Sequence, residues 1–495
     1  MMEKPARQAG QALIWQVIQL GSDKLLFFIR ILILARLLTP EDFGLVAIAT
    51  TSMGFFQNTT DIGLIPALVQ GKEVTEKQYN LVWTVGMIRG TLITIVMAMG
   101  APLIAFIFNE PQAIPVIRVL ALYPVLVASV SIKVAEQNRN LSFRPLAVLK
   151  MTESVVKVVV SVALAIVFGL WGLVVGTLAG SAAFSILSYI LAPHRPKLVF
   201  DWEAIRPLIR FGRWMFVMSL ITVAGGSILR IVITRQLGVA ALGLYYLATQ
   251  LAYLPSEVSS GIFGTVAFPL FSRLQSDLER VRTAFRTMVV GTAALLYPAC
   301  LFIFVFAPTF IAEVLGAKWI GTEALIQILS VATMIGIFGD TVVATLKGMG
   351  RPDQRTFMGL VQILTLTILV ALLTRRFGMV GAAFASIPAV LTSQLMGIIF
   401  VRQLMPQPLL GLVRPLGAIV IASLIGAIVG FFLDKYLIGM FGLIVAAVGF
   451  VLSTSVVLSI ANRRSSLGLD QDLMRVFPGM ATLLQKLEVK GFLVR

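Results

Sequence analysis

Apolar stretches of membrane-spanning length follow one another along almost the whole chain, with short connections rich in proline, glycine and charge. A helix that crosses a bilayer needs about 20 mainly apolar residues. Because the backbone in lipid must satisfy its own hydrogen bonds, such a chain folds into membrane helices. The fold class we predict is an all-α membrane protein with about 14 transmembrane helices, at residues 11–37, 43–68, 79–108, 114–134, 146–169, 172–192, 208–236, 241–267, 286–311, 322–346, 357–374, 378–402, 411–433 and 438–461.

Composition agrees with this class and excludes several others. Hydrophobic residues make up 58% of the chain and charged residues 13%, against about 45–50% and about 25% in soluble domains. A net charge of +17 would suggest nucleic acid in a soluble protein. Here we expect no nucleic-acid partner, because membrane proteins gather basic residues in their cytoplasmic loops. With one cysteine, Cys300, and one histidine, His194, we expect no disulfide, no metal site and no bound cofactor.

The loops alternate in charge. The even-numbered loops and the two termini carry about 28 Lys and Arg residues, and the odd-numbered loops about six. By the positive-inside rule both termini are cytoplasmic. The first helix lacks the short apolar core and cleavage pattern of a signal peptide, so we predict that it is retained.

Short motifs recur in the two halves of the chain. Arg30-Ile31-x-Ile33 matches Arg230-Ile231-x-Ile233, Gly44-Leu45 matches Gly243-Leu244, and Phe168-Gly169-x-x-Gly172 matches Phe377-Gly378-x-x-Gly381. These matches fall at the same topological points. Since six helices is an even number, the two lobes are predicted to form a parallel repeat whose axis lies along the membrane normal.

This repeat predicts the domain organisation. We expect an N-lobe at 1–193, a cytoplasmic loop at 194–207, a C-lobe at 208–405, two extra helices within 406–461 and a cytoplasmic tail at 462–495. Apolar residues recur at helical spacing in the tail beside Arg475 and Lys486. A surface helix on the membrane lipids is the simpler interpretation. The alternative is a docking site for a partner enzyme.

Charges inside spans are costly and commonly face a cavity or a partner. The basic candidates for substrate binding are Lys24, Arg30, Arg89, Arg118, Lys157 and Arg230. Arg30 and Arg230 occupy equivalent positions in the repeat, so they are predicted to face one another across a central cleft. Such a cleft attracts an anion, and the planar fork of a guanidinium suits a diphosphate.

Structural explanations exist for several of these cations. Arg118 lies near a membrane face, where a long side chain snorkels to water. Lys157 follows Glu153 by four residues, which is the spacing of an ion pair within a helix. Lys24 follows Asp23, which can neutralise it through a neighbouring helix.

Three acidic residues at depth, Asp61, Glu257 and Asp340, are candidates for binding a coupling cation, Na⁺ or H⁺. Glu257 follows Pro255, where a broken helix would also expose carbonyl groups. The alternative for each is simple pairing with a base.

Enzyme motifs are weak, and we predict no catalytic residues. Asp470-Gln471-Asp472 resembles a metal-binding D-x-D pattern, but it stands alone in the tail, where the N-terminus of a solvated helix explains it. The chain has no Walker A motif for ATP.

The run RILILARLLTPEDFGLVAIAT (Arg30 to Thr50), followed by Asp61-Ile62-Gly63-Leu64 and Ala67-Leu68-Val69-Gln70, resembles the opening of polysaccharide-exporting flippases. These belong to the multidrug/oligosaccharidyl-lipid/polysaccharide superfamily, and the branch most similar serves O-antigen and exopolysaccharides such as colanic acid, succinoglycan and xanthan. The resemblance implies two six-helix lobes around a cavity in a bacterial inner membrane. It implies that undecaprenyl-diphosphate-linked oligosaccharide is the substrate, held by Arg30, Arg230 and Lys24.

Three alternatives remain open at this point. A drug or metabolite antiporter of the same superfamily usually has twelve helices and fewer buried cations. A membrane-embedded polymerase or glycosyltransferase would need an acid–base constellation on a sizeable loop. A scaffold for polysaccharide assembly would not need buried arginines.

Overall fold

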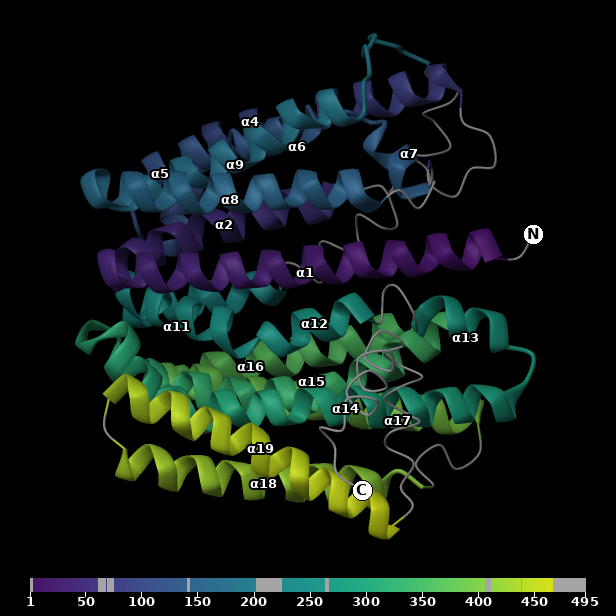
Figure 1. Ribbon diagram of the computed structural model, residues 1–495. Coiled ribbons are helices and arrows are strands. Elements are labelled where there is room, and N and C mark those ends of the chain that lie inside the picture. Colours follow the sequence, from purple (N-terminus) through teal and green to yellow (C-terminus); the bar gives the residue numbers. More distant parts are fainter. Residues whose placement is uncertain are drawn as a thin grey trace. The chain divides into compact units, whose positions relative to one another are not determined.

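The computed structural model describes residues 3–60, 68, 75–139, 143–201, 225–262, 267–405, 411–437 and 439–465. All regular secondary structure within these ranges is helical (Figure 1). The chain divides into two compact units, Met1–Gly243 and Leu244–Arg495. Each unit is described by itself.

Unit 1 contains long helices joined by short turns. Its described helices are α1 (Glu3–Leu37), α2 (Pro40–Thr60), α4 (Glu76–Phe108), α5 (Ala113–Leu120), α6 (Tyr123–Ala128), α7 (Val134–Arg139), α8 (Phe143–Phe168) and α9 (Leu170–Leu191), and α11 (Val239–Ala252) begins within it. Helices α8 and α9 pack closely along their length, and α8 also packs on α1.

Residues at the helix boundaries cap these helices. Before α2, the Thr39 backbone N–H donates to Asp42 Oδ2 at 2.9 Å, and the Asp42 N–H donates to Thr39 Oγ1 at 3.3 Å. Pro40 therefore lies in the first turn, where its missing N–H costs nothing. Before α4, Thr75 and Gln78 form a reciprocal capping box. Asn109 ends α4 in the left-handed conformation, with a φ of 57°.

A glycine makes the turn between α8 and α9. Gly169 has φ 54° and ψ −127°, a backbone conformation that residues other than glycine rarely adopt. A methyl group at Gly172 would overlap the backbone of Ala165, so the two helices approach closely just after the turn. The Phe-Gly-x-x-Gly motif is therefore a helical hairpin.

The equivalent motif in unit 2 has the same geometry. Gly378 interrupts α16 (Pro352–Phe384) with φ 59° and ψ −141°. A methyl group at Gly381 would overlap the Leu373 carbonyl. The predicted turn between the spans at 357–374 and 378–402 is thus present, and the helix of the second span begins within α16.

Unit 2 adds further long helices. These are most of α11, then α12 (Leu254–Ile262), α13 (Phe268–Leu274), α14 (Leu278–Thr309), α15 (Thr322–Gly348), α16, α17 (Ser386–Leu404), α18 (Val413–Tyr436) and α19 (Gly439–Ser465). Its main apolar core lies among α14, α15 and α17, and includes Phe285, Val342 and Val401.

Apolar side chains cover the outside of both units. Met99, Phe106, Val167 and Val413 are each more than 70% exposed, an arrangement that suits lipid rather than water. Within the described residues, nine helices are long and apolar enough to cross a membrane, and the segments Ala113–Ala128 and Val239–Ala252 are shorter apolar helices. The all-α membrane fold is therefore confirmed. The count of 14 remains a prediction.

Three predicted spans are not continuous helices: the span at 378–402 is divided at Ala385, between α16 and α17, and the other two are divided just before a proline. The span at 114–134 is divided into α5 and α6, with Pro124 in the first turn of α6. The span at 241–267 is divided at Tyr253, just before Pro255, into α11 and α12. A proline lacks the N–H that would continue the preceding helix, so both interruptions occur where a new helix begins.

The chain after α9 runs extended along the start of α4. The Lys197 N–H donates to Asn80 Oδ1 at 2.9 Å, and the Val199 N–H donates to Thr84 Oγ1 at 3.1 Å. His194 is buried at the start of this segment, where burial and the charge of Lys133 lower its pKa against the opposing effect of Glu76. The beginning of the predicted 194–207 loop is thus fastened to unit 1.

Candidate functional site

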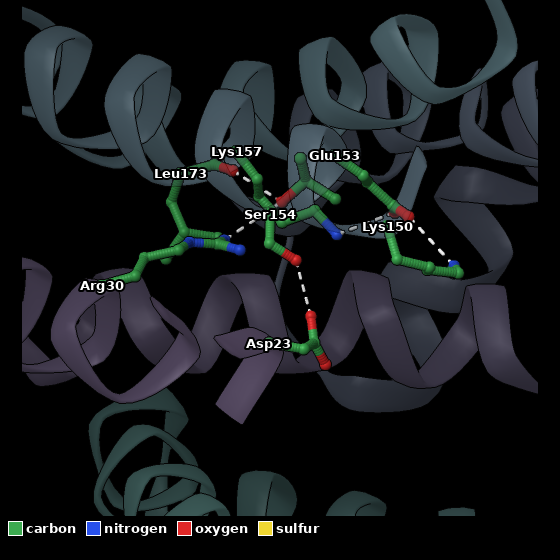
Figure 2. A network of polar contacts seen from close by, with 8 residues as sticks. Asp23, Arg30, Lys150, Glu153, Ser154, Lys157 and Leu173 are labelled. Carbon is green, nitrogen blue, oxygen red and sulfur yellow. Dashed lines mark hydrogen bonds and ion pairs between the residues drawn. The ribbon is translucent and has the colours of Figure 1, made fainter. Parts of the chain in front are cut away.

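A network of polar side chains joins α1, α8 and α9 within unit 1. Figure 2 shows Asp23 and Arg30 of α1 reaching toward α8 and α9, and Lys150, Glu153, Ser154 and Lys157 along α8. On α8 the four residues are spaced by one, three and four positions, which places them on one face of a helix. The helical periodicity of α8 therefore gathers these polar residues into a stripe along an otherwise apolar span.

Glu153 lies at the centre of this stripe. Its carboxylate accepts from Lys150 Nζ at 3.0 Å and from Lys157 Nζ at 3.1 Å. The glutamate is buried, whereas the two lysine side chains are 43% and 24% exposed. One carboxylate thus pairs with two ammonium groups, and the triad keeps a positive charge. The Glu153–Lys157 ion pair expected from the spacing is present.

Helix α1 contributes the second part of the network. Asp23 Oδ1 accepts a hydrogen bond of 2.6 Å from Ser154 Oγ, and Arg30 Nη2 donates to Thr177 Oγ1 of α9 at 3.2 Å. Asp23 and Arg30 are seven residues apart and share a face of α1. Lys24, beside Asp23, is half-buried.

Close packing of α8 on α9 brings the network together. Gly172, Gly176 and Gly180 recur every four residues on α9, a pattern that lets membrane helices approach closely. A Cβ on Gly180 would lie 2.9 Å from the Glu153 carbonyl and 3.0 Å from Lys157 Cβ. Gly180 therefore leaves room for the Lys157 side chain to lie against α9.

Two further predicted cations bind α2. Arg230 Nη1 donates to Thr51 Oγ1 at 3.0 Å. Arg89 of α4 donates from Nε to Thr60 Oγ1 at 3.0 Å and from Nη2 to the Gln57 carbonyl at 2.9 Å. Arg30 and Arg230 therefore have different partners, on α9 and α2. That they face a shared cleft stays a prediction.

Arg118 lies apart from this network, exposed in the last turn of α5. A cation there also interacts favourably with the carboxyl end of the helix. The structural explanation given for Arg118 in the sequence is thus compatible with its position.

The candidate cation-coupling acids differ in setting. Asp340 of α15 accepts a hydrogen bond of 2.5 Å from Ser259 Oγ of α12, and the charge of Arg355 acts on it. Glu257 is exposed in the first turn of α12. Asp61 lies outside the described residues. Among the described residues, no group of three or more His, Cys, Asp or Glu side chains could hold a metal ion.

Two features of the network were not predicted. Lys150 is not among the predicted cations because it lies near the start of a span, although its spacing of three from Glu153 indicates an ion pair. Of the repeated glycines of α9, only Gly172 belongs to a predicted motif. Their four-residue spacing was the signal for close packing.

Together with Lys24, the network holds six charged groups on α1 and α8. Four are cations, Lys24, Arg30, Lys150 and Lys157, and two are carboxylates, Asp23 and Glu153. This surplus of positive charge suits an anionic group. Within a membrane such an excess is costly unless an anion or water compensates it. The arrangement has the chemistry of a binding site.

Comparison with known proteins finds a family match and several relatives. A family model described as polysaccharide biosynthesis protein matches residues 33–324. Lipopolysaccharide biosynthesis protein WzxC of Escherichia coli (strain K12) is 24% identical over 71% of this chain and 72% of its own length. Succinoglycan biosynthesis transport protein ExoT of Rhizobium meliloti (strain 1021) is 27% identical over 72% of each chain.

Solved structures share the fold. The lipid II flippase MurJ in an inward closed conformation aligns with a TM-score of 0.74 and 15% identity, covering 91% of this chain and 99% of that one. An inward-facing multidrug resistance transporter of the MATE family, in the MOP superfamily, aligns with a TM-score of 0.58 and 16% identity, covering 78% and 98%. At these identities the likeness shows the fold alone.

Proposed function

The chain belongs to the polysaccharide biosynthesis protein family, and we propose that it is a flippase for undecaprenyl-diphosphate-linked oligosaccharide. It moves this lipid from the cytoplasmic to the periplasmic leaflet of a bacterial inner membrane, where exopolysaccharide or O-antigen is assembled. The sugar and diphosphate cross inside the protein while the polyprenyl chain stays in lipid. The protein acts as a transporter, without covalent chemistry of its own.

The observation that carries this proposal is the surplus of cations over carboxylates in the network of α1 and α8. A drug antiporter has no need for a network in which Arg30, Lys150 and Lys157 outnumber nearby acids. A diphosphate does, since ammonium and guanidinium groups both form charge-assisted hydrogen bonds to phosphate oxygens. Arg30 and Arg230 bind the diphosphate, with Lys24, Lys157 and Arg89 along its path. The names of WzxC and ExoT, a lipopolysaccharide biosynthesis protein and a succinoglycan biosynthesis transport protein, support a role in polysaccharide transport.

Transport proceeds by alternating access, driven by an ion gradient or by the membrane potential. The chain lacks a Walker A motif. An inside-negative potential favours outward movement of an anionic head group by about 2.3 kcal/mol per charge per 100 mV. Asp340, whose carboxylate accepts the Ser259 hydrogen bond, is one candidate for the coupling acid. Glu257 and Asp61 are the other candidates.

Both termini are cytoplasmic in this proposal, and glycosyltransferases and a polysaccharide polymerase are the partners that supply and consume the lipid. Reporter fusions test the orientation. Fusions after Arg36, Asn109 and Lys318 should report periplasm, and those after Gly71 and Arg280 cytoplasm. A reversed result at two of these sites contradicts the orientation.

Genetic complementation tests the function. The gene is deleted in a host without a redundant flippase and restored as wild type or as Arg30→Ala. Deletion should abolish surface polymer and accumulate lipid-linked precursor on the cytoplasmic side, and Arg30→Ala should do the same while inserting normally. Efflux defects with normal precursor would instead indicate an antiporter, and single surface units without chains a polymerase. Normal polymer in the deletion strain disproves the function.

A further inference from the structure

An apolar groove lies between α2 and α4, separate from the network on α8. It encloses about 250 Å³ and is lined by Phe55, Phe56, Thr59 and Thr60 of α2 and by Leu92, Ile93 and Val96 of α4. Leu92 is 59% exposed and Val96 43%. The groove therefore opens on the outside of this pair of helices, toward lipid.

Arg89 marks one end of the groove. Its Nε donates to Thr60 Oγ1, one of the lining side chains, and Ile93 lies one turn further along the same face of α4. The Arg89 guanidinium thus lies next to the apolar groove. A cation beside an apolar groove suits a lipid that carries phosphate at the end of its chain.

The depth of Arg89 in the membrane follows from its distance to the helix ends. Thr60 follows the start of α2 by about 30 Å, and Arg89 precedes the end of α4 by about 29 Å, at 1.5 Å per residue. The hydrocarbon core of a bilayer is about 30 Å thick. With the periplasmic edge of the core at Pro40 and Phe108, Arg89 and Thr60 lie one core thickness away, at the edge that the loop charges predict to be cytoplasmic. The predicted spans 43–68 and 79–108 continue past this edge, and the groove extends from it into the membrane.

The same helix carries the position bound by Arg230. Thr51, which accepts the Arg230 hydrogen bond, precedes Thr60 by nine residues, or about 13.5 Å along α2. Phe55 lies one turn after Thr51 on the same face. A head group bound at Arg89 would therefore need to move only about 13.5 Å along α2 to reach a second arginine, Arg230. A phospholipid that only lines the protein needs no second arginine for its head group. The two arginines therefore favour the transported lipid as the occupant of the groove.

We propose that the groove between α2 and α4 holds the first part of the polyprenyl chain of the substrate, with its diphosphate against Arg89. This rests on the flippase function proposed above and adds to it the place where the lipid docks before transport. Phe55 and Phe56 contact the chain, and Leu92 and Val96 form the outer wall of the groove.

Photo-crosslinking of the full-length protein tests this docking site. A benzoylphenylalanine replaces Leu92 in one variant and Met99 in the other. Met99 is the matched control, because it is 77% exposed on the same helix but does not line the groove. The proteins are placed in phosphatidylglycerol nanodiscs that contain undecaprenyl diphosphate, and adducts are identified by mass spectrometry.

We expect polyprenyl adducts at position 92 at several times their share at position 99, and a fall toward the control level with Arg89→Gln. Arg89→Lys should give an intermediate yield, because an ammonium keeps the charge and loses the fork. Phospholipid adducts alone, equal polyprenyl shares at both positions, or crosslinks to a second copy of the chain would overturn the proposal. An Arg89→Gln yield equal to wild type would overturn the role of Arg89. The assay needs no transport, so the complementation test can fail or succeed independently.

Discussion

Arg230 Nη1 donates a hydrogen bond of 3.0 Å to Thr51 Oγ1, so a cation from the seventh predicted span is anchored on α2. We expect Arg230→Ala to bind the substrate about 10- to 100-fold more weakly, since a charge-assisted hydrogen bond contributes about 1.5–3 kcal/mol. Arg230→Lys should recover part of this loss. Thr51→Val removes the anchor but keeps the charge, and should weaken binding less than Arg230→Ala. Binding of undecaprenyl diphosphate to the purified variants measures these effects, and equal affinities for wild type and Arg230→Ala would remove Arg230 from the site.

Gly180 controls the space available to Lys157. Because a Cβ there would lie 3.0 Å from Lys157 Cβ and 2.9 Å from a backbone carbonyl, Gly180→Leu should separate α8 from α9 and displace the lysine. Overpacking of this kind costs about 1–3 kcal/mol. The melting temperature in detergent and the amount of surface polymer should both fall. Gly100→Leu on α4, where a Cβ meets nothing within 4 Å, is the control and should change both far less.

At the hairpin glycines Gly169 and Gly378, the backbone conformation disfavours a side chain, although there is space for one. Nothing lies within 4 Å of a Cβ on Gly169 or Gly378, yet both have φ near 55–60° and a negative ψ. Alanine at either position should destabilise the protein by about 1–3 kcal/mol. Gly100→Ala, in an ordinary helix, should be neutral or stabilising by up to about 1 kcal/mol. Thermal unfolding of the three variants tests this, and an unchanged melting temperature for both hairpin variants would show that the turn tolerates a side chain.

His194 should make stability depend on pH. Burial lowers its pKa below the usual value of about 6.5, so the unfolded chain binds a proton more readily than the folded one. The contribution of the neutral imidazole is complete above that value and is lost as the pH falls from about 6.5 toward the lowered pKa. Melting temperatures between pH 8 and pH 5 should therefore fall more steeply for wild type than for His194→Gln. Parallel curves would mean that this histidine titrates normally.

Much of the fold follows from residues that act locally. The capping residues Thr39 and Asp42 and the hairpin glycines Gly169 and Gly378 determine where helices begin and turn, and each was visible in the sequence. Pro124 and Pro255 were visible too, but the division of their spans depends on how neighbouring helices support the interrupted segments. Hydropathy alone does not contain that information.

The candidate site was less accessible to sequence reasoning. The Glu153–Lys157 pair is local, so spacing was enough to predict it. The bonds from Arg30 to Thr177 and from Ser154 to Asp23 join residues more than 130 positions apart. Polar threonines and serines are common in membrane helices, and no local rule selects which of them an arginine will reach. Depth could be predicted from helix rise, whereas rotation about the helix axis could not.

The two hairpins have a use beyond this molecule. Gly169 and Gly378 adopt the same rare backbone conformation, each followed three residues later by a glycine with no room for a methyl group. Each hairpin needs its own pair of glycines, because neither the backbone conformation of the first nor the missing space at the second can be supplied by the other hairpin. A relative at about a quarter identity, such as WzxC or ExoT, that keeps Phe-Gly-x-x-Gly at both turns could be aligned to this chain at two separate points, one in each half.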